Sequence, residues 1–142
     1  MSIAIEEARA AGARGEVPVG CVVVRDGTIV ARAGNRTIAD HDPTAHAELI
    51  AIRAAASTLG SERLADCDLY VTLEPCAMCA AAVSFARIRR LYFGAADAKG
   101  GAVENGVRFF AAPTCHHRPE VYGGINESEC GELLKSFFQA RR

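Results

Sequence analysis

The sequence of 142 residues lacks tryptophan, has few aromatic residues and lacks an excess of either charge. Sixteen basic residues against 17 acidic ones leave a formal net charge of −1. Because domains that bind nucleic acid through their overall charge are usually strongly basic, a nucleic-acid partner has to be inferred from something other than charge. The basic residues that do cluster are more typical of solvated surfaces than of binding sites. They are Arg87, Arg89 and Arg90, followed by Arg141 and Arg142.

Long apolar runs and a leader pattern are also missing. No stretch approaches the length that crosses a bilayer, and the first seven residues lack the basic and then apolar order of a signal peptide. We therefore expect no membrane association and a cytoplasmic protein. The chain has six cysteines, but Cys21, Cys67 and Cys130 lie in apolar patterns, where a free cysteine behaves as a small hydrophobic residue. A reducing compartment explains this placement better than a set of disulfides.

Half of the residues are hydrophobic, which suits one compact α/β domain over residues 1–142. The apolar segments 69–73 and 88–93 are predicted strands, and the segment 77–86 between them is a predicted helix. In a strand–helix–strand unit the helix crosses over the sheet, so the two strands should be parallel. The helix should be buried, since it is small and apolar nearly all round. The remaining predicted elements are a helix over 6–14, strands over 17–24 and 29–33 joined at Asp26-Gly27, a helix from Asp42-Pro43 to Gly60, and a helix capped by Asn126 and Glu129.

One histidine and two cysteines supply the residue types that bind zinc. Cys76 and Cys79 stand three residues apart, so on a helix their sulfur atoms share one face. Pro75 suits the first position of that helix, whose positive end favours the thiolate form. With His46 there are three ligands, and three protein ligands leave a position for water, which is typical of catalytic rather than structural zinc. We predict one zinc ion per chain, held by His46, Cys76 and Cys79.

Glu48 follows His46 by two residues, at the start of a predicted helix. From that position its carboxylate can lie beside the metal without binding it, take a proton from a water held there and deliver it to a leaving group. We therefore predict that Glu48 is the catalytic residue.

The cysteine pair is also compatible with two non-catalytic roles. A Cys-x-x-Cys pair can be a redox couple, or it can be half of a closed structural zinc site. The fourth ligand of a closed site would come from Cys67, Cys115, His116 or His117. The run at 115–117 has no spaced partner and lies in an irregular stretch, over 97–118, where we expect Phe109 and Phe110 to pack beneath the loop.

The order His-x-Glu and then Pro-Cys-x-x-Cys is the signature of zinc-dependent nucleobase deaminases. Around these motifs the chain resembles bacterial tRNA-specific adenosine deaminases over nearly its full length. The stretches that carry the resemblance are Glu16-Val17-Pro18-Val19-Gly20, Gly34-Asn35-Arg36, His41-Asp42-Pro43-Thr44-Ala45-His46-Ala47-Glu48, Leu69-Tyr70-Val71-Thr72-Leu73-Glu74-Pro75-Cys76-Ala77-Met78-Cys79, Ala86-Arg87-Ile88 and Phe93-Gly94-Ala95-Ala96-Asp97-Ala98-Lys99.

The resemblance implies a three-layer α/β/α cytidine deaminase-like fold with a mixed sheet of about five strands, and a homodimer. It implies a zinc-dependent enzyme that converts adenosine to inosine at the wobble position of a tRNA anticodon, with an anticodon stem-loop rather than DNA as its partner. By position, Asn35 matches a residue that hydrogen-bonds the flipped base, and Asp97 matches one near the ribose. Lys99, with Phe138 and Arg141, matches residues that face the anticodon loop.

Rival functions share part of this pattern. A deaminase of a free nucleobase such as guanine would use the same zinc ligands and the same Glu48. A non-catalytic zinc or redox module would keep Cys76 and Cys79 without the chemistry. Family members also usually have several more residues before the equivalent of Ile5, so we expect a first helix that is short at its N-terminal end.

Overall fold

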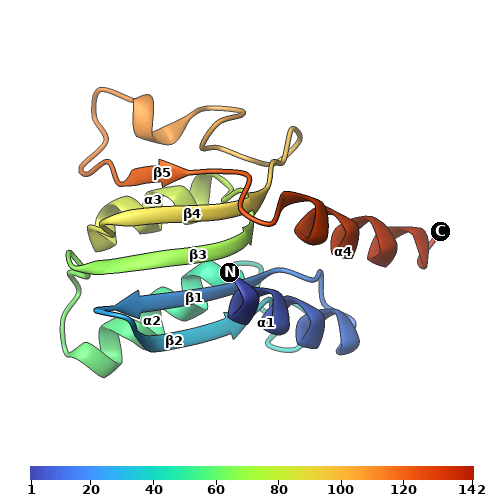
Figure 1. The fold of residues 1–142 in the computed structure, drawn as a ribbon. Coiled ribbons are helices and arrows are strands. Elements are labelled where there is room, and N and C mark those ends of the chain that lie inside the picture. Colours follow the sequence, from blue (N-terminus) through green and yellow to red (C-terminus); the bar gives the residue numbers. More distant parts are fainter.

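The structure, a computed structural model, describes residues 1–142 as a five-stranded sheet with helices on both faces (Figure 1). The strand order is β2-β1-β3-β4-β5. β1 pairs antiparallel with β2 and with β3, whereas β3, β4 and β5 run parallel, so the mixed sheet and the parallel crossover are both confirmed. The strands are β1 (Gly20–Arg25), β2 (Thr28–Gly34), β3 (Cys67–Leu73), β4 (Arg90–Ala95) and β5 (Glu120–Tyr122).

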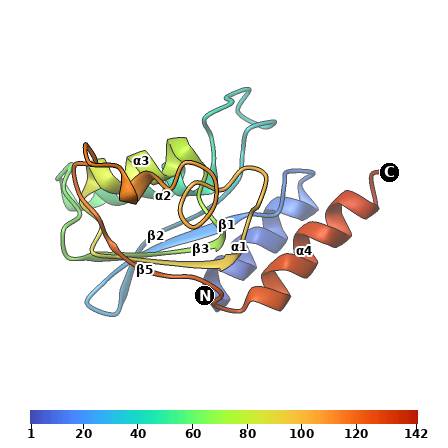
Figure 2. The same cartoon turned by 90° about the horizontal axis from the view of Figure 1, so that it is seen from above.

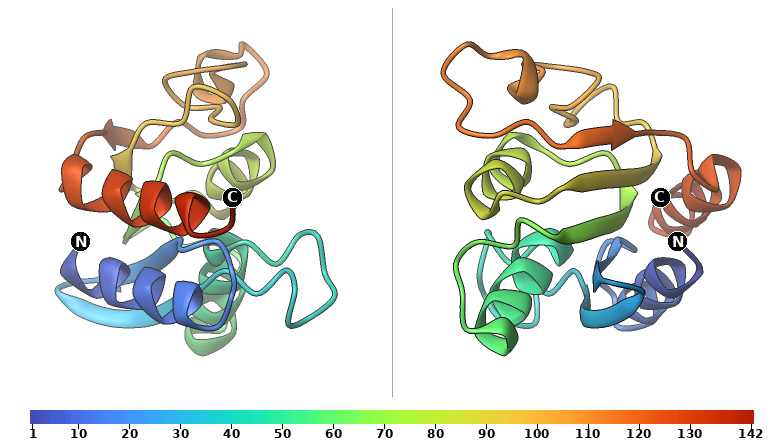
Figure 3. Two further views of the ribbon diagram at one scale, coloured as in Figure 1. Left: turned by 90° about the vertical axis from the view of Figure 1, so that its right-hand side faces the viewer. Right: turned by 60° about the vertical axis from the view of Figure 1, so that its left-hand side comes forward.

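Four helices cover the sheet as two outer layers (Figure 2). The first and last helices lie side by side on one face, and the two middle helices lie on the other, as the turned views in Figure 3 also show. This is the three-layer α/β/α arrangement expected. None of the helices combines the length and the apolar character needed to cross a membrane. The helices are α1 (Ser2–Ala13), α2 (Ala47–Leu59), α3 (Ala77–Ala86) and α4 (Glu127–Gln139), with a short 3-10 helix at Phe109–Ala111.

Strand β1 is buried in the core on both faces. Its residues Cys21, Val22 and Val23 are no more than 3% exposed, because α1 covers one face of the strand and α2 the other. The turn to β2 uses Asp26 and Gly27 with φ angles of 49° and 75°, the left-handed pair that a tight hairpin requires. The predicted hairpin is confirmed.

Helix α2 begins later than the sequence predicts. The Asp42 carboxylate accepts hydrogen bonds from the backbone N–H and the hydroxyl of Thr44, at 2.8 and 2.7 Å, so it closes a local turn instead of capping the helix. The backbone of His46 is still extended, with φ −75° and ψ 150°, and the helix starts at Ala47. Gly60 ends it in the left-handed conformation, as predicted.

Helix α3 spans the predicted residues, but two expectations about it are wrong. Cys76, with φ −71° and ψ 175°, is the N-cap, so Pro75 lies one residue before the cap and not at the first helical position. The helix is also buried on one side only: Ala80 and Val83 are fully buried, whereas Phe85 is 61% exposed. Because α3 is apolar nearly all round, its sequence does not show which face packs against the sheet.

In the C-terminal third of the chain, one prediction is confirmed and another is wrong. Phe110 is buried in the core and Phe109 packs against it, so both aromatic residues lie beneath the loop as predicted. Asn126 is the N-cap of α4, but its side chain donates to the Glu129 carboxylate at 3.4 Å in place of the backbone bonds of a capping box. The last turns of α4 project beyond the sheet, leaving Phe138 47% exposed (Figure 1).

Candidate active site

His46, Cys76 and Cys79 meet where two helices begin, since His46 is the N-cap of α2 and Cys76 the N-cap of α3. The Nδ1 atom of His46 lies 3.7 Å from Sγ of Cys76 and 3.6 Å from Sγ of Cys79. Zinc–sulfur bonds of about 2.3 Å and zinc–nitrogen bonds of about 2.0 Å at a tetrahedral angle place nitrogen and sulfur about 3.5 Å apart. The three side chains therefore have the spacing of a zinc site, and all three ligand atoms lie within 4.8 Å of one another.

No fourth His, Cys, Asp or Glu joins this cluster. The Cys115 thiol instead donates to the backbone carbonyl of His117, and the His117 ring contacts the carbonyl oxygen of Ile88 at 2.7 Å. All six cysteines are free. The structure thus contains neither a closed four-ligand site nor a disulfide. Residues 115–117 instead tie their loop to Ser84 of α3 and to Ile88.

The three groups of the cluster hydrogen-bond to one another and share protons. Hydrogen bonds from Cys79 and His46 lower the pKa of the Cys76 thiol to about 4. The hydrogen bond with Cys76 and then burial raise the pKa of Cys79, and the hydrogen bond with Cys76 raises the pKa of His46. The three groups therefore share protons that a dication would displace, leaving two thiolates and a neutral imidazole as ligands. The positive end of α3, where Cys76 is the N-cap, also favours the thiolate form of Cys76.

Glu48 is buried, at 4% exposure, and lines the same pocket as His46 and Cys76. Its carboxylate is not a member of the ligand cluster. Burial, opposed in part by a hydrogen bond from its own backbone N–H, raises the pKa of Glu48 to about 7. A carboxyl group with a pKa near neutrality can both accept and donate a proton at physiological pH.

The pocket that contains Glu48 has a volume of about 320 Å³. Asn35 and Thr37, from the loop between β2 and α2, line this pocket together with Asp97 and Gly100, which follow β4. The Asn35 side-chain oxygen accepts a hydrogen bond from the backbone N–H of Ala47 at 2.8 Å. Asn35 therefore ties its loop to the first turn of α2, and its amide N–H groups are the donors that remain for a substrate.

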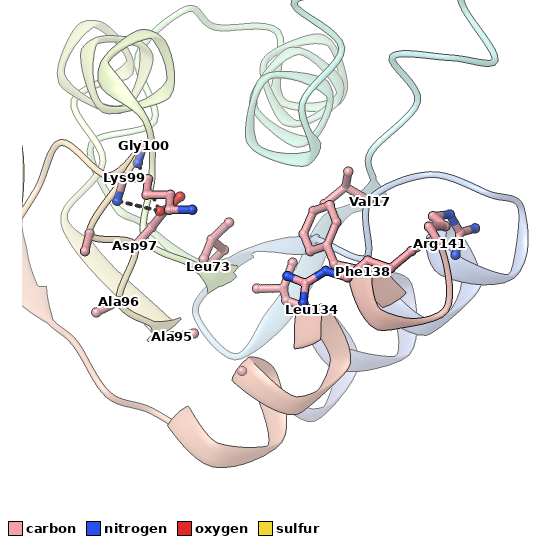
Figure 4. A pocket seen from close by; sticks show the side chains of 13 residues that line it. Val17, Leu73, Ala95, Ala96, Asp97, Lys99, Gly100, Leu134, Phe138 and Arg141 are labelled. Atoms are coloured by element: carbon pink, nitrogen blue, oxygen red, sulfur yellow. Dashed lines mark hydrogen bonds between the residues drawn. The ribbon is translucent and has the colours of Figure 1, made fainter. Parts of the chain in front are cut away.

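A wider groove of about 960 Å³ adjoins this pocket, and Figure 4 shows the side chains that line the groove. The two share Val17, Leu73, Asp97 and Gly100 in their walls. The Asp97 carboxylate accepts hydrogen bonds from the backbone N–H groups of Lys99 and Gly100, at 3.1 and 3.0 Å, which shapes the turn that forms one wall. The end of α4 supplies the other wall with Phe138, Arg141 and Arg142.

The structure brings every residue predicted for the site to this pocket, its metal cluster or the groove. His46, Glu48, Cys76, Asn35 and Asp97 line the pocket. Cys79 completes the metal cluster, and Lys99 lines the groove.

Two buried acidic residues near the pocket have no role in the sequence interpretation. Glu74 and Glu16 are 2% and 1% exposed, and both accept hydrogen bonds from loops that line the pocket. Burial alone would raise the pKa of each carboxyl group, but the hydrogen bonds outweigh burial and lower it. In the sequence, the only indication that these two residues are unusual is that each is a charged residue directly beside an apolar strand segment.

The fold and the site together define a zinc-binding deaminase, and a family model described as the cytidine and deoxycytidylate deaminase zinc-binding region matches residues 1–95. The chain is 63% identical to the tRNA-specific adenosine deaminase of Agrobacterium fabrum over 142 residues, which cover 100% of this chain and 93% of the relative. It is 47% identical to the tRNA-specific adenosine deaminase of Haemophilus influenzae, covering 100% of this chain and 83% of that one. The chain belongs to the family of tRNA-specific adenosine deaminases, and the resemblance noted in the sequence is confirmed.

A solved structure supports the same assignment. It comes from a study of A-to-I editing by tRNA:A34 deaminases at the wobble position of transfer RNA. It superimposes with a TM-score of 0.93 at 65% identity and covers 94% of this chain and 97% of that chain. The cytidine deaminase-like α/β/α fold is therefore shared over almost the whole length.

Proposed function

We propose that this protein hydrolytically deaminates adenosine to inosine at the wobble position of a tRNA anticodon, with release of ammonia. The observation that carries the proposal is a three-residue metal cluster that shares a pocket with a buried carboxyl group, and the pocket opens into a long groove. Such a site could attack several nucleobases. The similarity to tRNA-specific adenosine deaminases supports adenosine in tRNA as the substrate.

Each residue of the site has a role in this reaction. His46, Cys76 and Cys79 would hold one zinc ion per chain, which would make a water molecule acidic enough to attack the base at neutral pH. Glu48 accepts one proton of the attacking water and delivers it to N1 of the adenine as the water oxygen bonds to C6. It then takes the second proton from the C6 hydroxyl and gives it to the amino group, so that the C6–N bond breaks and ammonia leaves. Asn35 hydrogen-bonds the base through its free amide N–H groups.

The groove indicates how the RNA would lie. A base inside a stack cannot enter the pocket, so the substrate must be a flipped-out or looped nucleotide, a condition that an anticodon loop meets at little unstacking cost. Lys99 on one wall and Arg141 on the other would contact phosphates, and the exposed ring of Phe138 would stack on a neighbouring base. Asp97 lies where the pocket meets the groove, in reach of the ribose.

The direct test is an assay with a synthetic anticodon stem-loop that carries a wobble adenosine. We expect inosine at that position, and no turnover of free adenine, guanine or cytosine, or of the same stem-loop made of DNA. Turnover of free guanine without turnover of the stem-loop would instead support a free-base deaminase.

Lys99→Ala should weaken RNA binding and leave the chemistry unchanged. Loss of one phosphate contact to single-stranded RNA is expected to reduce the slope of log affinity against log salt by about 0.7, and to raise KM for the stem-loop several-fold at constant kcat. Lys135→Ala is the matched control, because Lys135 is exposed on α4 and does not line the groove. Equal effects of the two substitutions would show that Lys99 makes no specific contact.

We also infer a homodimer that acts in the cytoplasm. The outer side of α3 is apolar and carries Phe85, 61% exposed, beside the partly exposed Met78, Ala81 and Ala82. A second copy covering this side would remove an exposed apolar patch. Analytical ultracentrifugation should then give twice the chain mass of 15.0 kDa. A tRNA substrate and reduced ligand cysteines both suit the cytoplasm.

A further inference from the structure

Glu74 directly follows β3, and its buried carboxylate accepts five hydrogen bonds from one loop. Its Oε1 atom accepts from the backbone N–H of Asp97 at 2.9 Å and from the side-chain amide of Asn105 at 2.7 Å. Its Oε2 atom accepts from the backbone N–H groups of Val103, Glu104 and Asn105, at 3.1, 2.8 and 2.9 Å. Because five donors face two oxygen atoms, the carboxylate has no acceptor capacity left for a metal or a substrate.

These bonds join the start and the end of the loop 97–105 to the segment that carries a metal ligand. The backbone N–H of Ala102 also donates to the carbonyl oxygen of Pro75, the residue before Cys76, at 2.9 Å. The loop packs so closely that a Cβ atom at Gly101 would lie 2.5 Å from the carboxyl carbon of Glu74. The wall of the groove is therefore fixed in position relative to the metal cluster.

Glu16 accepts hydrogen bonds from a second loop that lines the pocket, residues 37–39. Its two oxygen atoms accept hydrogen bonds from the backbone N–H groups of Ile38 at 3.1 Å and Ala39 at 2.9 Å, and from the Thr37 hydroxyl at 3.5 Å. Thr37 lines the pocket next to Asn35. Two buried carboxylates thus hold two loops that both contribute residues to the pocket.

We propose that Glu74 and Glu16 are positioning residues for the RNA, which hold the loops 97–105 and 37–39 at a fixed distance from the metal ligands. This inference rests on the proposed function, since it assigns the loops to substrate binding. Neither carboxylate takes part in the proton transfers, so removing its charge should change how well substrate is bound more than how fast bound substrate reacts.

Glu74→Gln tests this role with almost no change in size. The amide has one oxygen and places an NH₂ group against N–H donors, so at least two of the five bonds are lost. We expect KM for the anticodon stem-loop to rise about tenfold, with kcat and zinc content within about twofold of wild type. Hydrogen exchange of the backbone amides of residues 97–105 should accelerate, while exchange in β3 and α3 stays unchanged.

Glu104→Gln is the matched control, because it makes the same chemical change in the same loop on an exposed side chain outside the bonded network. It should keep the wild-type KM and amide exchange. Unchanged KM and unchanged exchange in folded Glu74→Gln protein would overturn the proposal, as would a loss of zinc and kcat at constant KM, which would place Glu74 in the metal site.

Glu16→Gln is the second variant, should Glu74→Gln fail to fold. It should raise KM and accelerate amide exchange at residues 37–39, and no change in either would contradict the proposal. If the wild-type protein does not deaminate the stem-loop, the proposed function is wrong. Amide exchange still decides, independently of activity, whether the two carboxylates hold their loops.

Discussion

Glu48→Gln is expected to lower kcat for a wobble adenosine by about 10³–10⁴-fold while zinc stays bound at one ion per chain. The amide keeps the size of the side chain but cannot accept the proton of the attacking water or carry it to the base. Zinc should be retained because the carboxylate is not among the three clustered ligands. Single-turnover rates with the stem-loop, measured beside the metal content, separate the two effects.

The control for this substitution is Glu62→Gln. The Glu62 side chain is 88% exposed, in the loop that follows α2, so the same chemical change there should leave kcat unaltered. If Glu48→Gln retained more than about a tenth of the wild-type kcat, Glu48 would not be the proton shuttle.

Cys76→Ser should remove zinc and abolish activity without disturbing α3. A hydroxyl is not among the side chains that bind zinc in proteins, so we expect a metal content below about a tenth of an ion per chain. Serine is nevertheless a favourable N-cap residue, and Cys76 occupies that position, so the helix should be as stable as before. Metal analysis and circular dichroism of the same preparation measure both outcomes.

Cys115→Ser is the matched control, since Cys115 is also partly exposed but contributes to its own loop and not to the metal cluster. It should keep full zinc and full activity. A Cys76→Ser protein that holds zinc and remains active would contradict the three-ligand site.

The elements that the sequence predicts well are apolar runs bounded by clear turn or helix-end signals. β1, its hairpin with β2 and the limits of α3 follow from apolar patterning. The start of α2 does not, because Asp42-Pro43-Thr44 satisfies the rules for a helix N-terminus yet closes a separate turn. The extended backbone of His46 directs its imidazole toward the two cysteines. The sequence rules for helix N-termini do not predict that His46 stays outside the helix.

The site is predictable as far as residue types and spacing can define it. His46, Cys76 and Cys79 were recognisable because zinc accepts few ligand types, and Glu48 because of its distance from His46 in the chain. The sequence does not indicate a role for Glu74, because its hydrogen-bond donors begin 23 residues later, at Asp97, and are mostly backbone N–H groups. Nearly every residue has a backbone N–H group, so a sequence does not show which of them bond to a buried carboxylate. Hydrogen-bond networks of this kind are identified only from the structure.

The measurement that tests the account most directly is a zinc titration of metal-free protein, followed by the rate of inosine formation in an anticodon stem-loop. We predict no activity without metal, a linear rise with added zinc and a plateau at one ion per chain. Full turnover by protein that contains no metal, or one bound ion per chain with no inosine formed, would contradict the central claim.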